Sequence, residues 1–96
     1  SMRGWWYDKE TPLDGSKYSK FTVEYNNASE AMTVRLCVSN GLGSGSDSNS
    51  YVDAVPDTYH QQSVDINTTG TLQNLYLHSD TNGSITLRSA FLTKKP

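Results

Sequence analysis

The stretch Met32-Thr33-Val34-Arg35-Leu36-Cys37-Val38 places an apolar residue at every second position. Phe21-Thr22-Val23-Glu24-Tyr25, a little earlier in the chain, does the same. Successive side chains of a strand point to opposite faces of a sheet, so this alternation predicts strands with one apolar face, whereas an amphipathic helix would repeat about every 3.6 residues. We predict that the two stretches form a hairpin connected through Asn26-Asn27-Ala28-Ser29-Glu30.

Turn-forming residues separate the other short alternating runs. We predict further strands at 4–7, 51–55, 59–66, 74–78 and 85–92. In the run 59–66, Val64 and Ile66 are expected to face inward and Tyr59 and Gln61 outward. Asp80-Thr81-Asn82-Gly83 predicts a tight hairpin turn, and a change of phase near Ser89 predicts a bulge.

Seven or so short strands, with no run of helical period, predict an all-β fold. We expect an antiparallel β-sandwich with a jelly-roll or immunoglobulin-like strand order. A length of 96 residues suits one domain. We assign residues 4–93 to this domain, residues 1–3 to an N-terminal tail that begins with a Ser-Met cloning remnant, and residues 94–96 to a C-terminal tail. The Gly- and Ser-rich segment 41–50 is expected to be a surface loop between strands.

Composition and charge exclude several partners. The net charge is -2 and the chain has no basic stripe, so nucleic acid is not an expected partner. A membrane partner is not expected either, because no stretch approaches the roughly 18–20 apolar residues of a spanning helix. Cys37 is the single cysteine, which excludes an internal disulfide, and we expect it to be a buried or half-buried small residue.

Catalytic motifs are missing from the chain. Hydrolysis of a glycoside needs two carboxylates facing each other across the scissile bond, but the acidic residues here are scattered and most lie in predicted turns. Gly43-Ser44-Gly45 resembles part of a nucleophile motif, but no helix is predicted after it. We therefore expect a domain that is not an enzyme.

The histidines and acidic residues offer little evidence for a metal site. His60 and His78 belong to no cluster with zinc-ligand spacing. A structural calcium ion is a weak candidate. Unlike zinc, calcium accepts carboxylate and amide oxygens from loops. The residues that would supply them are Asp47, Asn49, Asp53 and Asp57. The alternative is that these are ordinary turn residues, and no cofactor is expected to be required.

Aromatic residues give the clearest functional signal, above all in Gly4-Trp5-Trp6-Tyr7. In a regular strand Trp5 and Trp6 point to opposite faces, so one can enter the core and the other is offered to solvent. An exposed ring desolvates the face of a sugar, while amide, guanidinium and hydroxyl groups hydrogen-bond its rim. The candidate carbohydrate-binding residues are Trp5, Trp6, Tyr59, Gln61, Tyr76 and Arg88.

Two segments, 14–25 and 75–92, carry a family resemblance. They resemble the small β-sandwich carbohydrate-binding modules that are appended to bacterial plant-cell-wall glycanases, including family 5 endoglucanases. The likeness extends from about Gly4 to Leu92. Binding residues vary among such modules, so the resemblance carries over only the Trp5/Trp6 aromatic position.

The resemblance implies a non-catalytic module that recognises β-glucan chains, namely β-1,4-glucan, mixed-linkage glucan or xyloglucan. Its partners would be the polysaccharide and a covalently linked glycoside hydrolase, in a secreted or cell-surface bacterial protein. Many such modules also hold a structural calcium ion. The alternative function is an immunoglobulin-like or fibronectin-like spacer or adhesion module that binds no glycan.

Overall fold

The computed structural model describes residues 3–27, 31–39, 48–67, 70–79 and 84–96, and at some strand positions it describes the backbone alone. The elements in chain order are β1 (Arg3–Asp14), the 3-10 turn η1 (Gly15–Lys17), β2 (Tyr18–Asn27), β3 (Met32–Ser39), β4 (Ser48–Ala54), β5 (Thr58–Asp65), β6 (Thr71–Ser79) and β7 (Ile85–Lys94). The prediction of an all-β fold is confirmed. Within the described residues no helix is long and apolar enough to cross a membrane.

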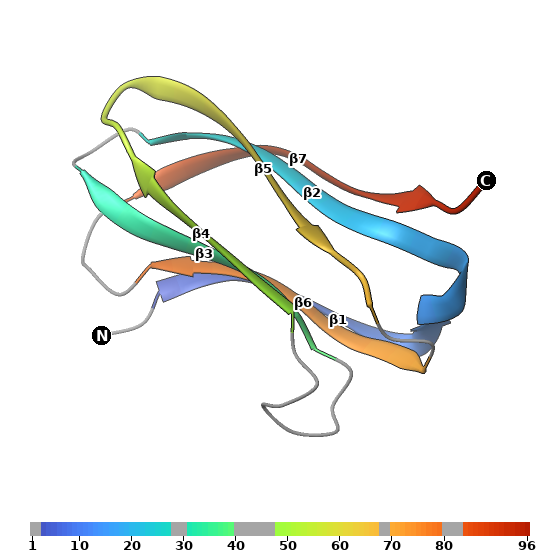
Figure 1. The fold of residues 1–96 in the computed structure, drawn as a ribbon. Coiled ribbons are helices and arrows are strands. Elements are labelled where there is room, and N and C mark those ends of the chain that lie inside the picture. The colour runs from blue at the N-terminus through green and yellow to red at the C-terminus, as the bar shows by residue number, and fades with distance from the viewer. Residues whose placement is uncertain (1–2, 28–30, 40–47, 68–69, 80–83) are drawn as a thin grey trace.

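The strands form two sheets that lie one above the other (Figure 1). Sheet A has the order β1-β6-β3-β4 and sheet B the order β5-β2-β7. All of the strand pairs are antiparallel. Each sheet turns one face toward the other, and this arrangement gives the alternating strands a common place to bury their apolar side chains.

Both predicted hairpins are wrong. β2 belongs to sheet B and β3 to sheet A, so the connection after Asn27 crosses between the layers. The connection from β6 to β7 crosses in the same way, from sheet A to sheet B. Two strands that each have one apolar face can bury these faces either as neighbours in one sheet or as members of two facing sheets. The alternation of apolar residues therefore does not predict which of these arrangements forms. By contrast, β3 and β4 do pair, and residues 48–50 of the predicted loop 41–50 belong to β4, so the loop prediction is wrong for them.

The predicted bulge in the last strand is confirmed. On β2, Glu24 pairs with Ser89 and the next residue, Tyr25, pairs with Leu87. Arg88 is therefore the extra residue of a β-bulge. The phase of β7 changes at this point, so the residues on either side of Arg88 do not follow a single alternation.

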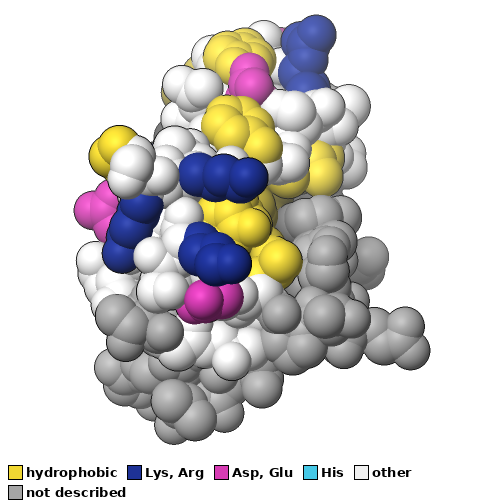
Figure 2. Space-filling view, turned by 90° about the vertical axis from the view of Figure 1, so that its right-hand side faces the viewer, with side chains coloured by type: hydrophobic (Ala, Val, Ile, Leu, Met, Phe, Trp, Pro, Cys, Tyr) yellow, Lys and Arg dark blue, Asp and Glu magenta, His cyan; other side chains and the backbone are white. Residues whose placement is uncertain are grey.

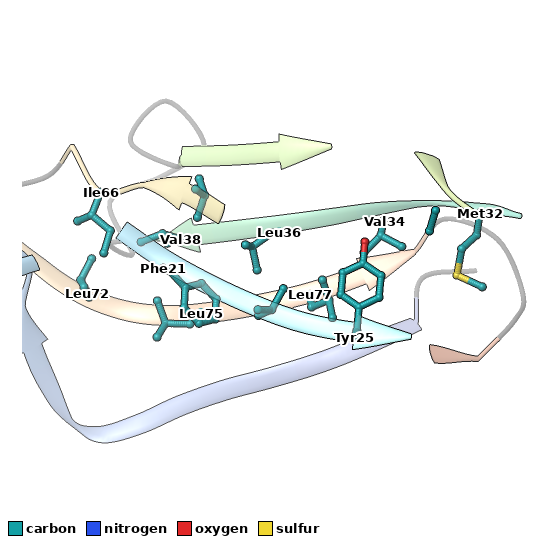
Figure 3. Packing of buried hydrophobic residues seen from close by; sticks show 13 residues of the cluster. Phe21, Tyr25, Met32, Val34, Leu36, Val38, Ile66, Leu72, Leu75 and Leu77 are labelled. Atoms are coloured by element: carbon teal, nitrogen blue, oxygen red, sulfur yellow. The ribbon is translucent and has the colours of Figure 1, made fainter. Parts of the chain in front are cut away.

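The core lies between the two sheets (Figure 3). β2 contributes Phe21, Val23 and Tyr25, each no more than 1% exposed. Facing them from sheet A are apolar residues of β3 and β6, namely Val34, Leu36, Val38, Leu72, Leu75 and Leu77. Cys37 is also fully buried, as predicted, although it alternates with the core residues of β3.

A chain of hydrogen bonds joins the two sheets inside this core. The Tyr25 hydroxyl on β2 donates to Oε1 of the buried Gln62 on β5, at 2.8 Å. The Nε2 group of Gln62 donates to the Val34 carbonyl on β3, at 3.2 Å. The His60 ring stacks on Tyr25 with a centroid distance of 5.3 Å, and its Nε2 accepts from the Val55 N–H. Buried polar groups need such partners, so this network specifies how the layers are aligned.

Burial of the Tyr25 hydroxyl makes the stability of the fold depend on pH in the alkaline range. Burial raises the pKa of the Tyr25 phenol from its ordinary 10 to about 12. The unfolded chain therefore loses this proton at lower pH than the folded chain does, and stability falls as pH rises through the window from about 10 to about 12. Thermal melts across that window should show a steeper fall for the wild type than for Tyr25→Phe. Equal slopes would contradict the assignment to Tyr25.

Candidate functional site

The residues predicted to bind sugar fall on two different sheets. Tyr59 and Gln61 lie on β5 and Arg88 lies on β7, all in sheet B. Trp5 and Trp6 lie on β1 and Tyr76 on β6, both in sheet A. The structure therefore divides the predicted sugar-binding residues into two groups, one on sheet A and one on sheet B.

In sheet A the backbone register separates the two tryptophan positions. Trp5 pairs with Leu77, which is fully buried in the core. Trp6 pairs with Tyr76, which in turn pairs with Cys37 on β3. Directly paired residues belong to the same face of a sheet. By register, Trp5 thus occupies a position in the core row and Trp6 a position in the outer row, to which Cys37 also belongs.

In sheet B the alternation of β5 puts the predicted residues on the outer face. Val64 is buried, whereas Gln61 is exposed and Tyr59 is 49% exposed. This confirms the inward and outward sides predicted for the strand. Gln61 pairs with Glu24 on β2, and Glu24 also pairs with Ser89 on β7, so one row crosses all three strands.

Glu24 is the centre of a group that we call the Glu24 cluster, formed by Glu24, Tyr59, Arg88 and Ser89. The Tyr59 hydroxyl donates to Oε2 of Glu24. The Ser89 hydroxyl donates to Oε1 of the same carboxylate, at 2.8 Å. One acid thus ties β5 and β7 to the central strand and holds the exposed Tyr59 ring in place from its polar end.

Arg88 approaches the Tyr59 ring from the other edge of the sheet. Its Cζ atom lies 6.0 Å from the ring centroid, at the outer limit of a cation–π contact. The bulge accounts for this placement, because an extra residue re-aims a side chain out of the regular alternation. An exposed aromatic ring is therefore flanked by one cation and one anion.

The hydrogen bonds of the cluster shift the pKa values of Glu24 and Tyr59. The Tyr59 hydroxyl, followed by the Ser89 hydroxyl and the charge of Arg88, lowers the pKa of Glu24 below its ordinary value. The hydrogen bond to Glu24 raises the pKa of the Tyr59 phenol. At neutral pH the cluster therefore contains a charged acceptor and a neutral phenol that donates to it. Each carboxylate oxygen has a further lone pair for a ligand hydroxyl.

Three residues of this face were not among the sequence candidates: Glu24, Ser89 and Phe91. Glu24 alternates with Val23 and Tyr25, a signal that already places it outside the core. Phe91 is 43% exposed. The predicted phase change at Ser89 could have identified it, because the bulge moves Phe91 from the inward to the outward row.

Charges on the outer face of sheet B are balanced. Besides Glu24 and Arg88, it carries Lys20 and Asp65, whose Nζ and Oδ1 atoms are 3.5 Å apart. At the end of the molecule where the C terminus lies, which is a different view from the face of sheet B, the described basic and acidic side chains are also interspersed with hydrophobic ones and form no continuous stripe of one sign (Figure 2). Such a surface offers little attraction to a highly charged polymer.

The calcium prediction is tested only in part. Asp47 lies outside the described residues, and the side chains of Asn49 and Asp53 are not described. Asp57 follows β4 with a φ of 55°, a left-handed conformation that aspartate tolerates in turns. Among the described residues no group of three or more His, Cys, Asp and Glu could hold a metal ion. A structural calcium ion stays a prediction.

Comparison with known proteins gives no relative on which to base a function. No protein-family model matches the chain, and no match was found among curated proteins or solved structures.

Proposed function

We propose that the protein is a non-catalytic carbohydrate-binding module with a β-sandwich fold, which binds β-glucan chains on the outer face of sheet B. The observation that carries this proposal is the Tyr59 ring, which is 49% exposed and tethered through its hydroxyl to Glu24. A large exposed ring that is fixed in position is suited to stack on a sugar, because little side-chain entropy remains to be lost on binding.

The neighbours of Tyr59 supply hydrogen bonds to the rim of a sugar ring. Glu24 is a charged acceptor for sugar hydroxyls, and Arg88, whose Cζ atom lies over the Tyr59 ring, is a charged donor. Gln61, exposed and paired with Glu24, can both donate and accept. Each of two vicinal hydroxyls of a neutral sugar needs a hydrogen-bond donor or acceptor, and Gln61, Glu24 and the neighbouring Arg88 provide both.

The lowered pKa of Glu24 does not suit the general acid of a glycosidase. A general acid in a glycosidase needs a raised pKa, but the hydrogen bonds from Tyr59 and Ser89 lower the pKa of Glu24. The proposed role is therefore to hold an attached glycoside hydrolase on cell-wall polysaccharide, in a secreted or cell-surface protein, by raising its local concentration.

Affinity electrophoresis through gels that contain barley β-glucan or xyloglucan tests the proposal. We expect both polymers, or one of them, to retard the wild type. Tyr59→Ala should weaken binding about tenfold through loss of the stacking surface. Tyr59→Phe, which keeps the ring and loses the tether to Glu24, should show an intermediate loss. Val55→Ala is the matched control, because Val55 is an exposed apolar residue that is 56% accessible and lies outside the cluster.

Absence of retardation by every polymer would overturn the proposal and favour the spacer or adhesion module. If Trp6→Ala abolishes retardation and Tyr59→Ala does not, glycan binding stands but its site lies on sheet A. The sequence prediction for Trp6 and Tyr76 would then be the correct one.

A further inference from the structure

Two exposed aromatic rings lie at separate positions on the outer face of sheet B. Tyr59 on β5 is 49% exposed and Phe91 on β7 is 43% exposed. On the central strand β2, Tyr59 pairs with Asn26 and Phe91 pairs with Thr22. The two rings are thus on opposite flanking strands and four residues apart along β2, on a diagonal of the sheet.

Strand geometry sets the length of this diagonal. Two steps between strands of about 4.8 Å, combined with four residues of about 3.4 Å, separate the two Cα atoms by about 17 Å. One sugar ring cannot contact two aromatic rings so far apart. A chain of several linked sugar units can, so the two rings correspond to the two ends of one extended ligand.

The surface between the two rings is polar, and its side chains on the central strand β2 are half-buried or buried. Glu24 and Ser89 occupy the middle row and are only half-exposed. In the next row Thr22 is 5% exposed, and its hydroxyl is 2.8 Å from that of Ser63. Hydroxyl and carboxylate groups along this floor can bind the rims of the sugar units between the two stacking positions.

We propose that this face binds an uncharged glycan chain along the diagonal from Tyr59 to Phe91, with one stacking subsite at each end. The inference rests on the proposed function and adds the length, direction and charge of the ligand. We infer an uncharged ligand because the face carries one acid and one base both at Glu24 and Arg88 and at Lys20 and Asp65, so that attraction of a charged chain by one member is offset by repulsion from the other.

Isothermal titration calorimetry with cellobiose through cellohexaose tests the inference. For the wild type we expect affinity to rise with chain length until the ligand spans both rings, and then to level off. Phe91→Ala and Tyr59→Ala should each lower the affinity for cellohexaose about tenfold and remove the dependence on length. Val55→Ala should leave the profile unchanged, and added sodium chloride should have little effect because the ligand is neutral.

The outcomes separate the inference from the function on which it rests. If the oligosaccharides bind but Phe91→Ala keeps the wild-type length profile, the diagonal is overturned and glycan binding stands. If a galacturonan oligomer binds more tightly than the neutral chain, the assignment of charge is overturned. If no oligosaccharide and no polymer binds, both proposals fail. Unchanged melting temperatures would show that the variants are folded, as expected for exposed residues.

Discussion

Tyr25→Ala is expected to lower the free energy of unfolding by about 3–5 kcal/mol, the usual effect of removing a buried aromatic side chain. Tyr25 is fully buried between the sheets. Its loss leaves a cavity beside the His60 ring and removes the donor to Gln62 Oε1. Because a domain of this size has a total stability of about 5–15 kcal/mol, the variant should be close to unfolding. Urea denaturation followed by tryptophan fluorescence measures the effect.

Tyr25→Phe is the matched control for this prediction. It keeps the ring and removes only the hydroxyl that donates to Gln62, so a loss of about 1–2 kcal/mol is expected. The ratio of the two losses separates packing from hydrogen bonding. If Tyr25→Ala were no worse than Tyr25→Phe, the ring would not be the main contact between the layers at this position.

Trp5→Ala is expected to lower the free energy of unfolding by about 3–5 kcal/mol, and Trp6→Ala is expected to lower it by less than Trp5→Ala does. The reason is the register of β1 with β6. Trp5 pairs with the fully buried Leu77 and so holds a position in the core row, while Trp6 holds a position in the outer row.

Urea denaturation of both tryptophan variants, followed by circular dichroism so that the probe is not the mutated residue, tests this difference. Leu77→Ala is a useful companion, because it removes a described core residue paired with Trp5 and should cost about 2–5 kcal/mol. Equal losses from Trp5→Ala and Trp6→Ala would contradict the assignment of the two positions to different rows.

The candidate site could be predicted only in fragments. The alternation of β5 identified Tyr59 and Gln61 as outward residues, because burial of Val64 and Ile66 fixes the phase of that strand. Glu24 was not found, because nothing in its own strand shows that β5 and β7 will lie on either side of it. Its partners Tyr59 and Ser89 are 35 and 65 residues away in sequence.

The alternation of apolar residues by itself determined that the chain forms strands, which side of β2, β3 and β5 faces the core, and where β7 is bulged. These properties depend on neighbouring residues along one strand, and the burial of one face is enough to specify them. The tertiary structure decided which strands pair. It placed β2 opposite β3 and not beside it, and it gathered Glu24, Tyr59 and Arg88 on one sheet while the tryptophans lie on the other. Strand pairing depends on contacts between distant segments, and strands with the same apolar alternation satisfy several pairings equally well until the whole core is assembled.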